Sequence, residues 1–156
     1  MRTMTYGSTG LTVTKTGFGA LPIQRRNMQD AIEILQYAYE AGFRLFDSAH
    51  TYSDSEEKIG AALGDVRKDI VIATKTPATD RDTILQHVET SLKNLRTDYI
   101  DIFQFHNPKA VPDADSEGYR TMQELKDQGV IRVIGISNHS AENAIFAQSF
   151  SSFATL

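Results

Sequence analysis

The sequence has no cysteine and no long hydrophobic run, and each absence excludes a class of protein. Without cysteine among the 156 residues, disulfides, thiolate metal sites and a cysteine nucleophile are excluded within this chain. No run approaches the roughly 18 apolar residues that a membrane-spanning helix needs. The first residues, MRTMTYGSTG, contain no apolar segment of the kind found in signal peptides. We therefore expect a cytoplasmic protein with no membrane partner.

Positive charge is also scarce. Sixteen lysines and arginines stand against twenty aspartates and glutamates, which gives a net charge of −4, and no basic run occurs. Because nucleic-acid binding depends on clustered cations, we expect no nucleic-acid partner and favour a small-molecule one. A chain of this length buries roughly 70% of its unfolded surface, so it forms one domain or part of one.

Four short apolar runs each end in a polar residue at nearly even spacing. The runs GFRLF, IVIAT, IDIFQF and IRVIGI are followed by Asp47, Lys75, His106 and Ser137, at intervals of 28, 31 and 31 residues. An interval of about 30 residues is the length of a strand, a crossover helix and the return to the next strand. Gly19, in TGFGA, extends the period backwards by 28 residues. The carboxyl ends of parallel strands share one face of a sheet, so these residues are expected to gather there.

Helix signals fill the gaps between the predicted strands, and residues 1–14 predict a hairpin. We expect helices from a cap at Asn27 to Gly42, from a capping box of Ser53 and Glu56 to Gly64, over about residues 82–95 and 116–128, and from near Ala141. The tail, residues 149–156, resembles a loop leading into a further strand. Strict alternation of strands and helices predicts an α/β fold with a parallel sheet.

Two closures of that sheet compete. An open doubly wound sheet needs a glycine-rich phosphate turn after its first strand, but TGFGALPIQRR lacks the third glycine and meets Pro22 where the helix would begin. This favours a (β/α)8 TIM-barrel type, which typically needs about 250 residues. We expect residues 1–156 to be the N-terminal portion of one barrel domain, with five βα units. Its open strand edges predict a truncated product or self-association.

The strand-end residues suit proton transfer. Tyr52 follows Asp47 by five residues and should overhang the same face. A phenol with a pKa of about 10 is a weak acid, and a neighbouring ammonium lowers that pKa. We expect Lys75 to be this neighbour, Asp47 to orient Lys75, and neutral His106 to donate a hydrogen bond to a carbonyl oxygen. Together they would form a general-acid site that lacks only an electron source.

Each candidate also has a structural interpretation. Asp47 and Lys75 taken alone indicate an ion pair at the rim of a barrel, His106 alone a core histidine, and Tyr52 alone loop packing. Their occurrence together favours function. Ser137 and Asn138 alone are equally typical of a helix cap.

Three further histidines have simpler interpretations. His50 and His139 lie beside the motif residues and either touch substrate or are exposed loop residues, the latter being favoured. His87 is expected to be a solvated helix residue. A metal-dependent barrel hydrolase is disfavoured, since it commonly needs a histidine pair on the first strand and TGFGA has none; we expect no metal site.

The segments FDSAHTYSDSEEKIGAAL, IATKT, DIFQFHN and KDQGVIRVIGISNHS resemble the motifs of the aldo-keto reductase family, in order and at the right separations. The resemblance implies a catalytic tetrad of Asp47, Tyr52, Lys75 and His106. In it Tyr52 would be the general acid, Lys75 and Asp47 its tuning pair, and His106 the group that orients the substrate.

The resemblance also implies a cofactor, NADP(H) rather than NAD(H). Ser137 and Asn138 would hydrogen-bond its nicotinamide carboxamide, and Gly19, Ala20 and Asp47 would lie beside it. Hydride would pass to an aldehyde or ketone while Tyr52 protonates the oxygen. The aromatic platform for the nicotinamide and the basic residues for the adenosine phosphates would come from later strands. We therefore expect very poor NADPH affinity if these 156 residues are the entire protein.

Two functions follow from these expectations. The first is a nicotinamide-dependent carbonyl reductase. The second is a non-catalytic or regulatory protein that kept the reductase scaffold, and the intact tetrad favours the first. The segments LPIQRR and FQFHNPKAVP additionally resemble a branch of the family that continues into a ferredoxin-like iron–sulfur region.

Overall fold

The computed structural model describes residues 1–148 and residue 153. Its centre is a five-stranded parallel sheet in the order β3-β4-β5-β6-β7. The strands are β3 (Phe18–Gly19), β4 (Leu45–Asp47), β5 (Val71–Thr76), β6 (Ile100–His106) and β7 (Ile131–Ser137). Sequential order without a switch point distinguishes this sheet from a doubly wound one, so the expected α/β barrel-type arrangement of parallel units is confirmed.

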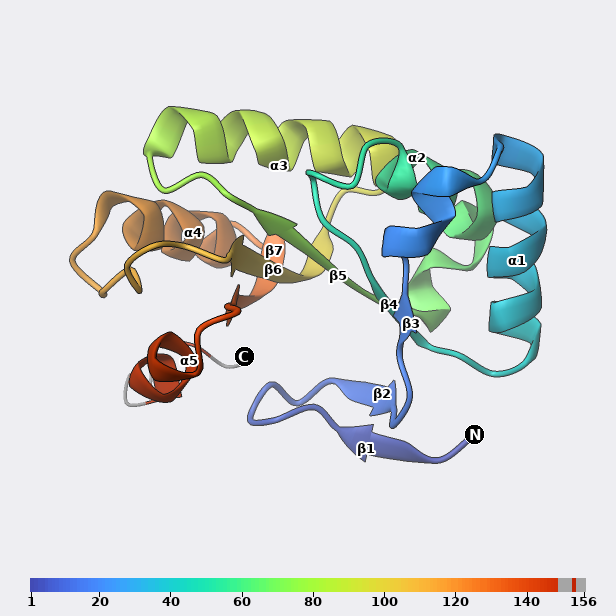
Figure 1. Cartoon of the computed structure of the whole chain (residues 1–156), viewed down its shortest axis with the longest axis horizontal. Coiled ribbons are helices and arrows are strands. Elements are labelled where there is room, and N and C mark those ends of the chain that lie inside the picture. The colour runs from blue at the N-terminus through green and yellow to red at the C-terminus, as the bar shows by residue number, and fades with distance from the viewer. Residues whose placement is uncertain (149–152, 154–156) are drawn as a thin grey trace.

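Helices cover one face of this sheet (Figure 1). These helices are α1 (Met28–Glu40), α2 (Ser55–Leu63), α3 (Arg81–Leu95) and α4 (Glu117–Asp127). The connections also contain the 3-10 helices η1 (Leu21–Arg25) and η2 (Gly64–Asp69), and α5 (Ala141–Gln148) follows β7 apart from the other helices. Within the described part of the chain, no helix is long and apolar enough to cross a membrane. The strand predicted in residues 149–156 lies outside the described residues.

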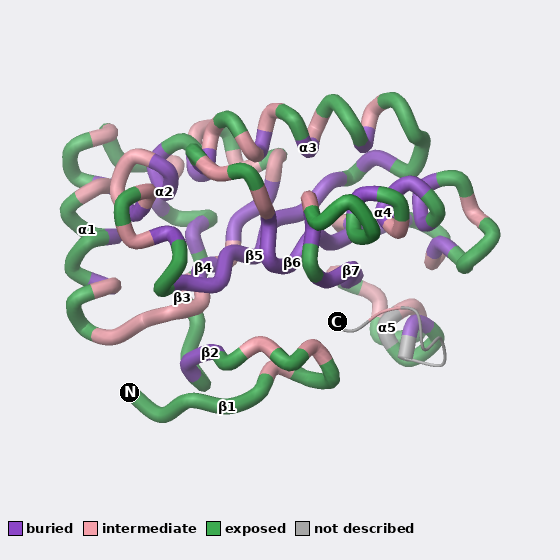
Figure 2. The backbone as a smooth tube through the Cα atoms, turned by 180° about the vertical axis from the view of Figure 1, so that it is seen from behind, coloured by how far each residue is buried: buried purple, intermediate pink, exposed green. Residues whose placement is uncertain are grey.

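The hairpin expected in residues 1–14 is present, formed by β1 (Thr3–Thr5) and β2 (Thr12–Thr14). It lies on the side of the sheet away from α1–α4 (Figure 1). Val13 of this hairpin packs against Val71, Ile102 and Val133 in a small second core. The larger core fills the space between the sheet and its helices. In Figure 2 the long central strands are buried along most of their length, whereas β1 is exposed.

The predicted cap at Asn27 and the predicted helix start at residue 116 are confirmed, and α3 begins after a cap, Asp80, that the sequence analysis does not name. The Asn27 side chain accepts from the backbone N–H of Asp30 at 2.8 Å, and the Asp80 and Ser116 side chains cap α3 and α4 in the same way. The predicted capping box of Ser53 and Glu56 is wrong. No side-chain bond caps α2, and Glu56 instead lies buried, accepting a hydrogen bond from the Thr74 hydroxyl at 2.6 Å.

Strand register aligns the predicted site residues. Gly19 is level with Asp47, Asp47 with Ala73, and His106 with Ser137. The 28-residue and 31-residue intervals therefore place successive strand ends at one edge of the sheet.

Candidate functional site

Lys75 and Asp47 form the centre of the site. The Lys75 Nζ atom donates to both carboxylate oxygens of Asp47 at 2.7 Å and to the Ser48 carbonyl at 2.6 Å. Lys75 is only 5% exposed, whereas the Asp47 side chain is 43% exposed. An ammonium has three N–H donors, so these three contacts use all of them.

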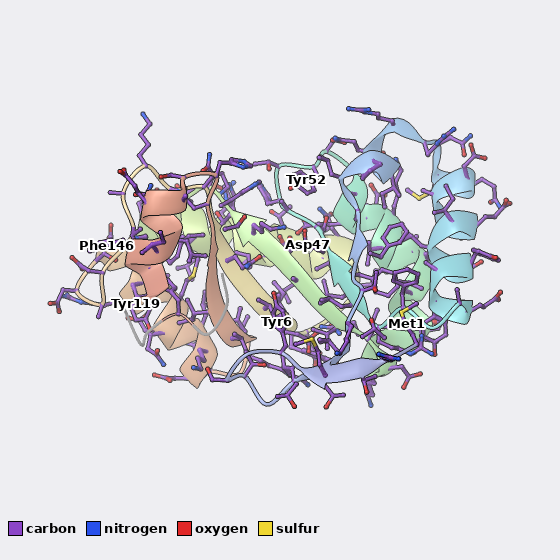
Figure 3. The ribbon with its side chains drawn as sticks, turned by 60° about the horizontal axis from the view of Figure 1, so that its bottom comes forward. Met1, Tyr6, Asp47, Tyr52, Tyr119 and Phe146 are labelled. Carbon is purple, nitrogen blue, oxygen red and sulfur yellow. The ribbon has the colours of Figure 1, made fainter. Side chains whose placement is uncertain are left out.

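Tyr52 lies beside this pair, in the loop between β4 and α2. Its ring centre is 5.5 Å from the Lys75 Nζ atom and 5.7 Å from the His106 ring, which it meets edge to face. Figure 3 shows Tyr52 and Asp47 near one another, with Tyr6 of the hairpin farther away. The structure thus brings all four members of the predicted tetrad to one end of the sheet.

The pKa of Tyr52 differs from the sequence-based expectation. Burial and, to a smaller extent, the negative charge of Asp47 raise the pKa of Tyr52 above its ordinary value. The expected lowering by Lys75 is not found: the ammonium is ion-paired with Asp47, whose negative charge opposes its effect on the phenol, and among the described residues no hydrogen bond joins it to Tyr52. Tyr52 therefore holds its proton throughout the neutral range.

His106 ends β6 with its ring half-buried. Its Nδ1 atom lies 3.3 Å from the Thr51 hydroxyl. Burial, then the positive charges of Lys75 and His139, lower the pKa of His106, and Asp47 opposes them. The imidazole is neutral at neutral pH, as the sequence analysis expects. If Nδ1 accepts from Thr51, the ring proton is on Nε2, where it can be donated outward.

Gly19 and Ala20 border the site at the end of β3. A side chain built on Gly19 would meet nothing within 4 Å, so open space adjoins it. Ala20 is fully buried; its N–H donates to the Asp47 carbonyl at 2.8 Å, and its own carbonyl accepts from the Ser55 hydroxyl at 2.9 Å. The start of α2 therefore fixes the segment that the predicted cofactor would border.

Ser137 and Asn138 lie at the end of β7, and neither caps α5. The Ser140 hydroxyl accepts from the Asn143 N–H, so the cap interpretation belongs to Ser140. The Asn138 side chain donates to the Pro108 carbonyl at 3.0 Å and accepts from the Ser140 N–H at 2.8 Å. An amide NH2 group has two N–H donors, and the bond to Pro108 uses one of them.

A cavity of about 620 Å³ adjoins His106. Its walls come from the loops after β5 and β6 and include Pro77, Thr79, Val111 and Pro112. Sequence reasoning missed this cavity and also Thr51. The proline-containing stretch after His106 was the available signal for a shaped loop.

Two histidines are not where the sequence analysis placed them. His50 and His87 were expected to be exposed or solvated, but their rings stack with centres 3.8 Å apart. Both are half-buried, because the β4–α2 loop folds against α3. His139 is exposed, as expected.

Comparison with known proteins identifies the chain's relatives. Residues 7–149 match the model of the aldo/keto reductase family. The chain belongs to this family. It is 34% identical over 161 residues to aldo-keto reductase YhdN of Bacillus subtilis, covering 91% of this chain and 48% of that protein.

Solved structures of this family share the fold. The aldo-keto reductase AKR11C1 of Bacillus halodurans superposes with a TM-score of 0.85 at 28% identity, over 99% of this chain and 55% of that one. An aldo/keto reductase of Klebsiella pneumoniae, solved in complex with NADP and acetate, superposes with a TM-score of 0.80 at 26% identity, over 90% of this chain and 51% of that one. The chain thus spans about half the length of the relatives it matches.

Proposed function

We propose that this chain carries the proton-transfer half of an NADP(H)-dependent carbonyl reductase that converts an aldehyde or ketone to an alcohol. The observation that carries the proposal is the meeting of Tyr52, Lys75, Asp47 and His106 at one end of the sheet. A structural ion pair alone would not need a phenol and a neutral imidazole beside it.

The roles of the side chains follow from their protonation. Neutral His106 donates through Nε2 to the carbonyl oxygen of the substrate and fixes its position. Tyr52, whose phenol keeps its proton at neutral pH, is the general acid that delivers that proton to this oxygen. Lys75 holds Asp47 and the Ser48 carbonyl, which fixes the base of the loop carrying Tyr52.

The residues present fit a nicotinamide in part. The open side of Gly19 leaves room for a ring, and the half-exposed Ser137 offers a hydroxyl at the level of His106. When bound, the reduced cofactor would supply the hydride. Ser137 is proposed to bond the carboxamide together with Asn138, whose amide nitrogen has a second N–H besides the one bonded to Pro108. The solved relative that holds NADP supports NADP(H) over NAD(H).

The test is oxidation of NADPH by simple aldehydes, compared between the wild-type chain, Tyr52→Phe and Tyr37→Phe. Tyr37 lies on α1 and is 73% exposed, so it is the matched control. Loss of a general acid lowers turnover by about 10²- to 10⁴-fold. We expect that loss in Tyr52→Phe only. Equal turnover in Tyr52→Phe and wild type contradicts the mechanism.

A second candidate is a regulatory scaffold without turnover. The phosphate sites of barrels are built by loops after strands seven and eight, and the parallel sheet of the described residues has five strands, so a scaffold role is kept as the alternative. Titration of NADPH fluorescence with this chain separates the two candidates. Binding without oxidation of NADPH supports the scaffold, whereas aldehyde-dependent oxidation rejects it.

Membership of the branch with a ferredoxin-like region also belongs to the proposal. It is supported only by LPIQRR and FQFHNPKAVP. Iron analysis of a longer protein containing these residues tests it: bound iron supports this branch, and its absence from such a protein purified without oxygen contradicts it.

A further inference from the structure

The β4–α2 loop, residues 48–54, carries Tyr52 and is held on two sides. On one side its backbone is tied to β5: the Ser48 N–H donates to the Ala73 carbonyl at 2.8 Å and the His50 N–H to the Lys75 carbonyl at 2.9 Å. On the other side the His50 ring stacks on His87 of α3, with an angle of 24° between the ring planes. In Figure 1 this loop passes beside α3.

His87 is itself fixed to the sheet. Its Nδ1 atom is 2.7 Å from the Thr76 hydroxyl, which also accepts from the Ala78 N–H at 3.1 Å. Thr76 directly follows Lys75 on β5. The His87 ring thus connects α3, the end of β5 and the loop that carries Tyr52.

The stack suits neutral rings. The buried Nδ1 atom of His50 has no hydrogen-bond partner among the residues that the structure describes. An unpaired buried nitrogen is already unfavourable, and protonation would add a positive charge and a buried N–H without an acceptor. Two protonated rings 3.8 Å apart would also repel each other.

We propose that His87 is a positioning residue for Tyr52: by stacking its neutral ring on His50, it holds the β4–α2 loop in place, and protonation of the stacked pair releases that loop. That this loop serves carbonyl reduction rests on the proposed function. The proposal that His87 holds the loop does not depend on that function, and it can be measured without enzyme turnover.

Charges around the stack set its pH response. Burial and the positive charge on His50 lower the pKa of His87, while Asp80 at the start of α3 and Glu56 of α2 oppose them. Burial lowers the pKa of His50. The Lys75 ammonium is directed away, toward Asp47 and Ser48. Both rings are therefore neutral at neutral pH and become charged at a lower pH than an ordinary histidine.

The test is amide hydrogen exchange by NMR on the 156-residue chain. The reporters are the N–H groups of His50 and Tyr52, bonded to the Lys75 and Ala49 carbonyls. Amides of β6 report global opening. His87→Ala removes the ring, His87→Phe keeps a flat stacking surface that cannot be protonated, and His139→Ala is the control at an exposed histidine.

We expect His87→Ala to lower protection of the two loop amides by about tenfold or more, while β6 is unchanged. His87→Phe should restore that protection. As the pH falls below the ordinary histidine pKa of about 6.5, the wild-type loop should lose protection when the pair protonates, and His87→Phe should lose much less.

Three results would overturn the proposal. The first is unchanged loop protection in His87→Ala. The second is an acid response in His87→Phe equal to that of wild type. The third is an equal loss of protection in His139→Ala. If His87→Ala fails to fold, the proposal is still tested by comparing the loss of loop protection at low pH between His87→Phe and wild type.

Discussion

Replacing Lys75 with methionine tests the centre of the site directly. Methionine keeps most of the apolar stem but removes the ammonium and its three hydrogen bonds to Asp47 and Ser48. The Ser48 carbonyl, in a residue that is 0% exposed, then loses a donor. Leaving such a group unpaired costs about 1–2 kcal/mol.

The loss at Asp47 is smaller. Its side chain is 43% exposed, so water rehydrates much of the carboxylate, and we assign about 1 kcal/mol to it. The free energy of unfolding should therefore fall by about 2–3 kcal/mol. For a chain of this size, that lowers Tm by roughly 4–12 °C.

Urea unfolding followed by circular dichroism measures this loss. Lys15→Met is the matched control, because Lys15 is exposed and no side-chain contact of it is described. A double-mutant cycle that combines Lys75→Met with Asp47→Asn should give a coupling free energy of about 1 kcal/mol between residues 75 and 47. The reasoning is refuted if Lys75→Met unfolds within about 0.5 kcal/mol of Lys15→Met.

Three further predictions follow from buried or unpaired groups. Burial raises the pKa of Glu56, so the folded state binds the Glu56 proton more tightly than the unfolded chain does. Stability against unfolding should therefore fall as the pH rises from about 4.3 through the higher folded-state pKa. Urea midpoints at several pH values should show this fall in wild type but not in Glu56→Gln, and an equal fall in both would refute the prediction. Lys58→Met should lower the free energy of unfolding, measured in urea, by about 2 kcal/mol, because the buried ammonium donates to the Ile23 and Arg26 carbonyls. A decrease equal to that of Lys15→Met would count against this prediction. β3 and β7 end the described sheet, so we predict self-association, which a stable monomer in sedimentation would exclude.

Much of the site is predictable because strand ends repeat with the period of the βα unit. A 28-residue or 31-residue interval fixes which residues share an edge without any knowledge of packing, so the meeting of Asp47, Lys75 and His106 follows from spacing alone. The helix starts at Asn27 and Ser116 are similarly local, since a cap needs only its own next few residues.

Contacts between distant segments could not be predicted from such patterns. A glutamate three residues after a serine looks the same whether it caps a helix or, like Glu56, turns inward to Thr74. The stack of His50 on His87 depends on how closely the loop approaches α3. The pKa of Tyr52 depends on how far the phenol is buried and on the nearby charge of Asp47, and the sequence shows neither.

Transfer of deuterium from labelled NADPH to an aldehyde tests the central claim most directly. The cofactor is labelled at the transferable hydride, and mass spectrometry of the alcohol locates the label. The account predicts deuterium on the former carbonyl carbon with the wild-type chain and with Tyr37→Phe, and its loss with Tyr52→Phe. Equal labelling of the alcohol by Tyr52→Phe and wild type would contradict the assignment of Tyr52 as the proton donor.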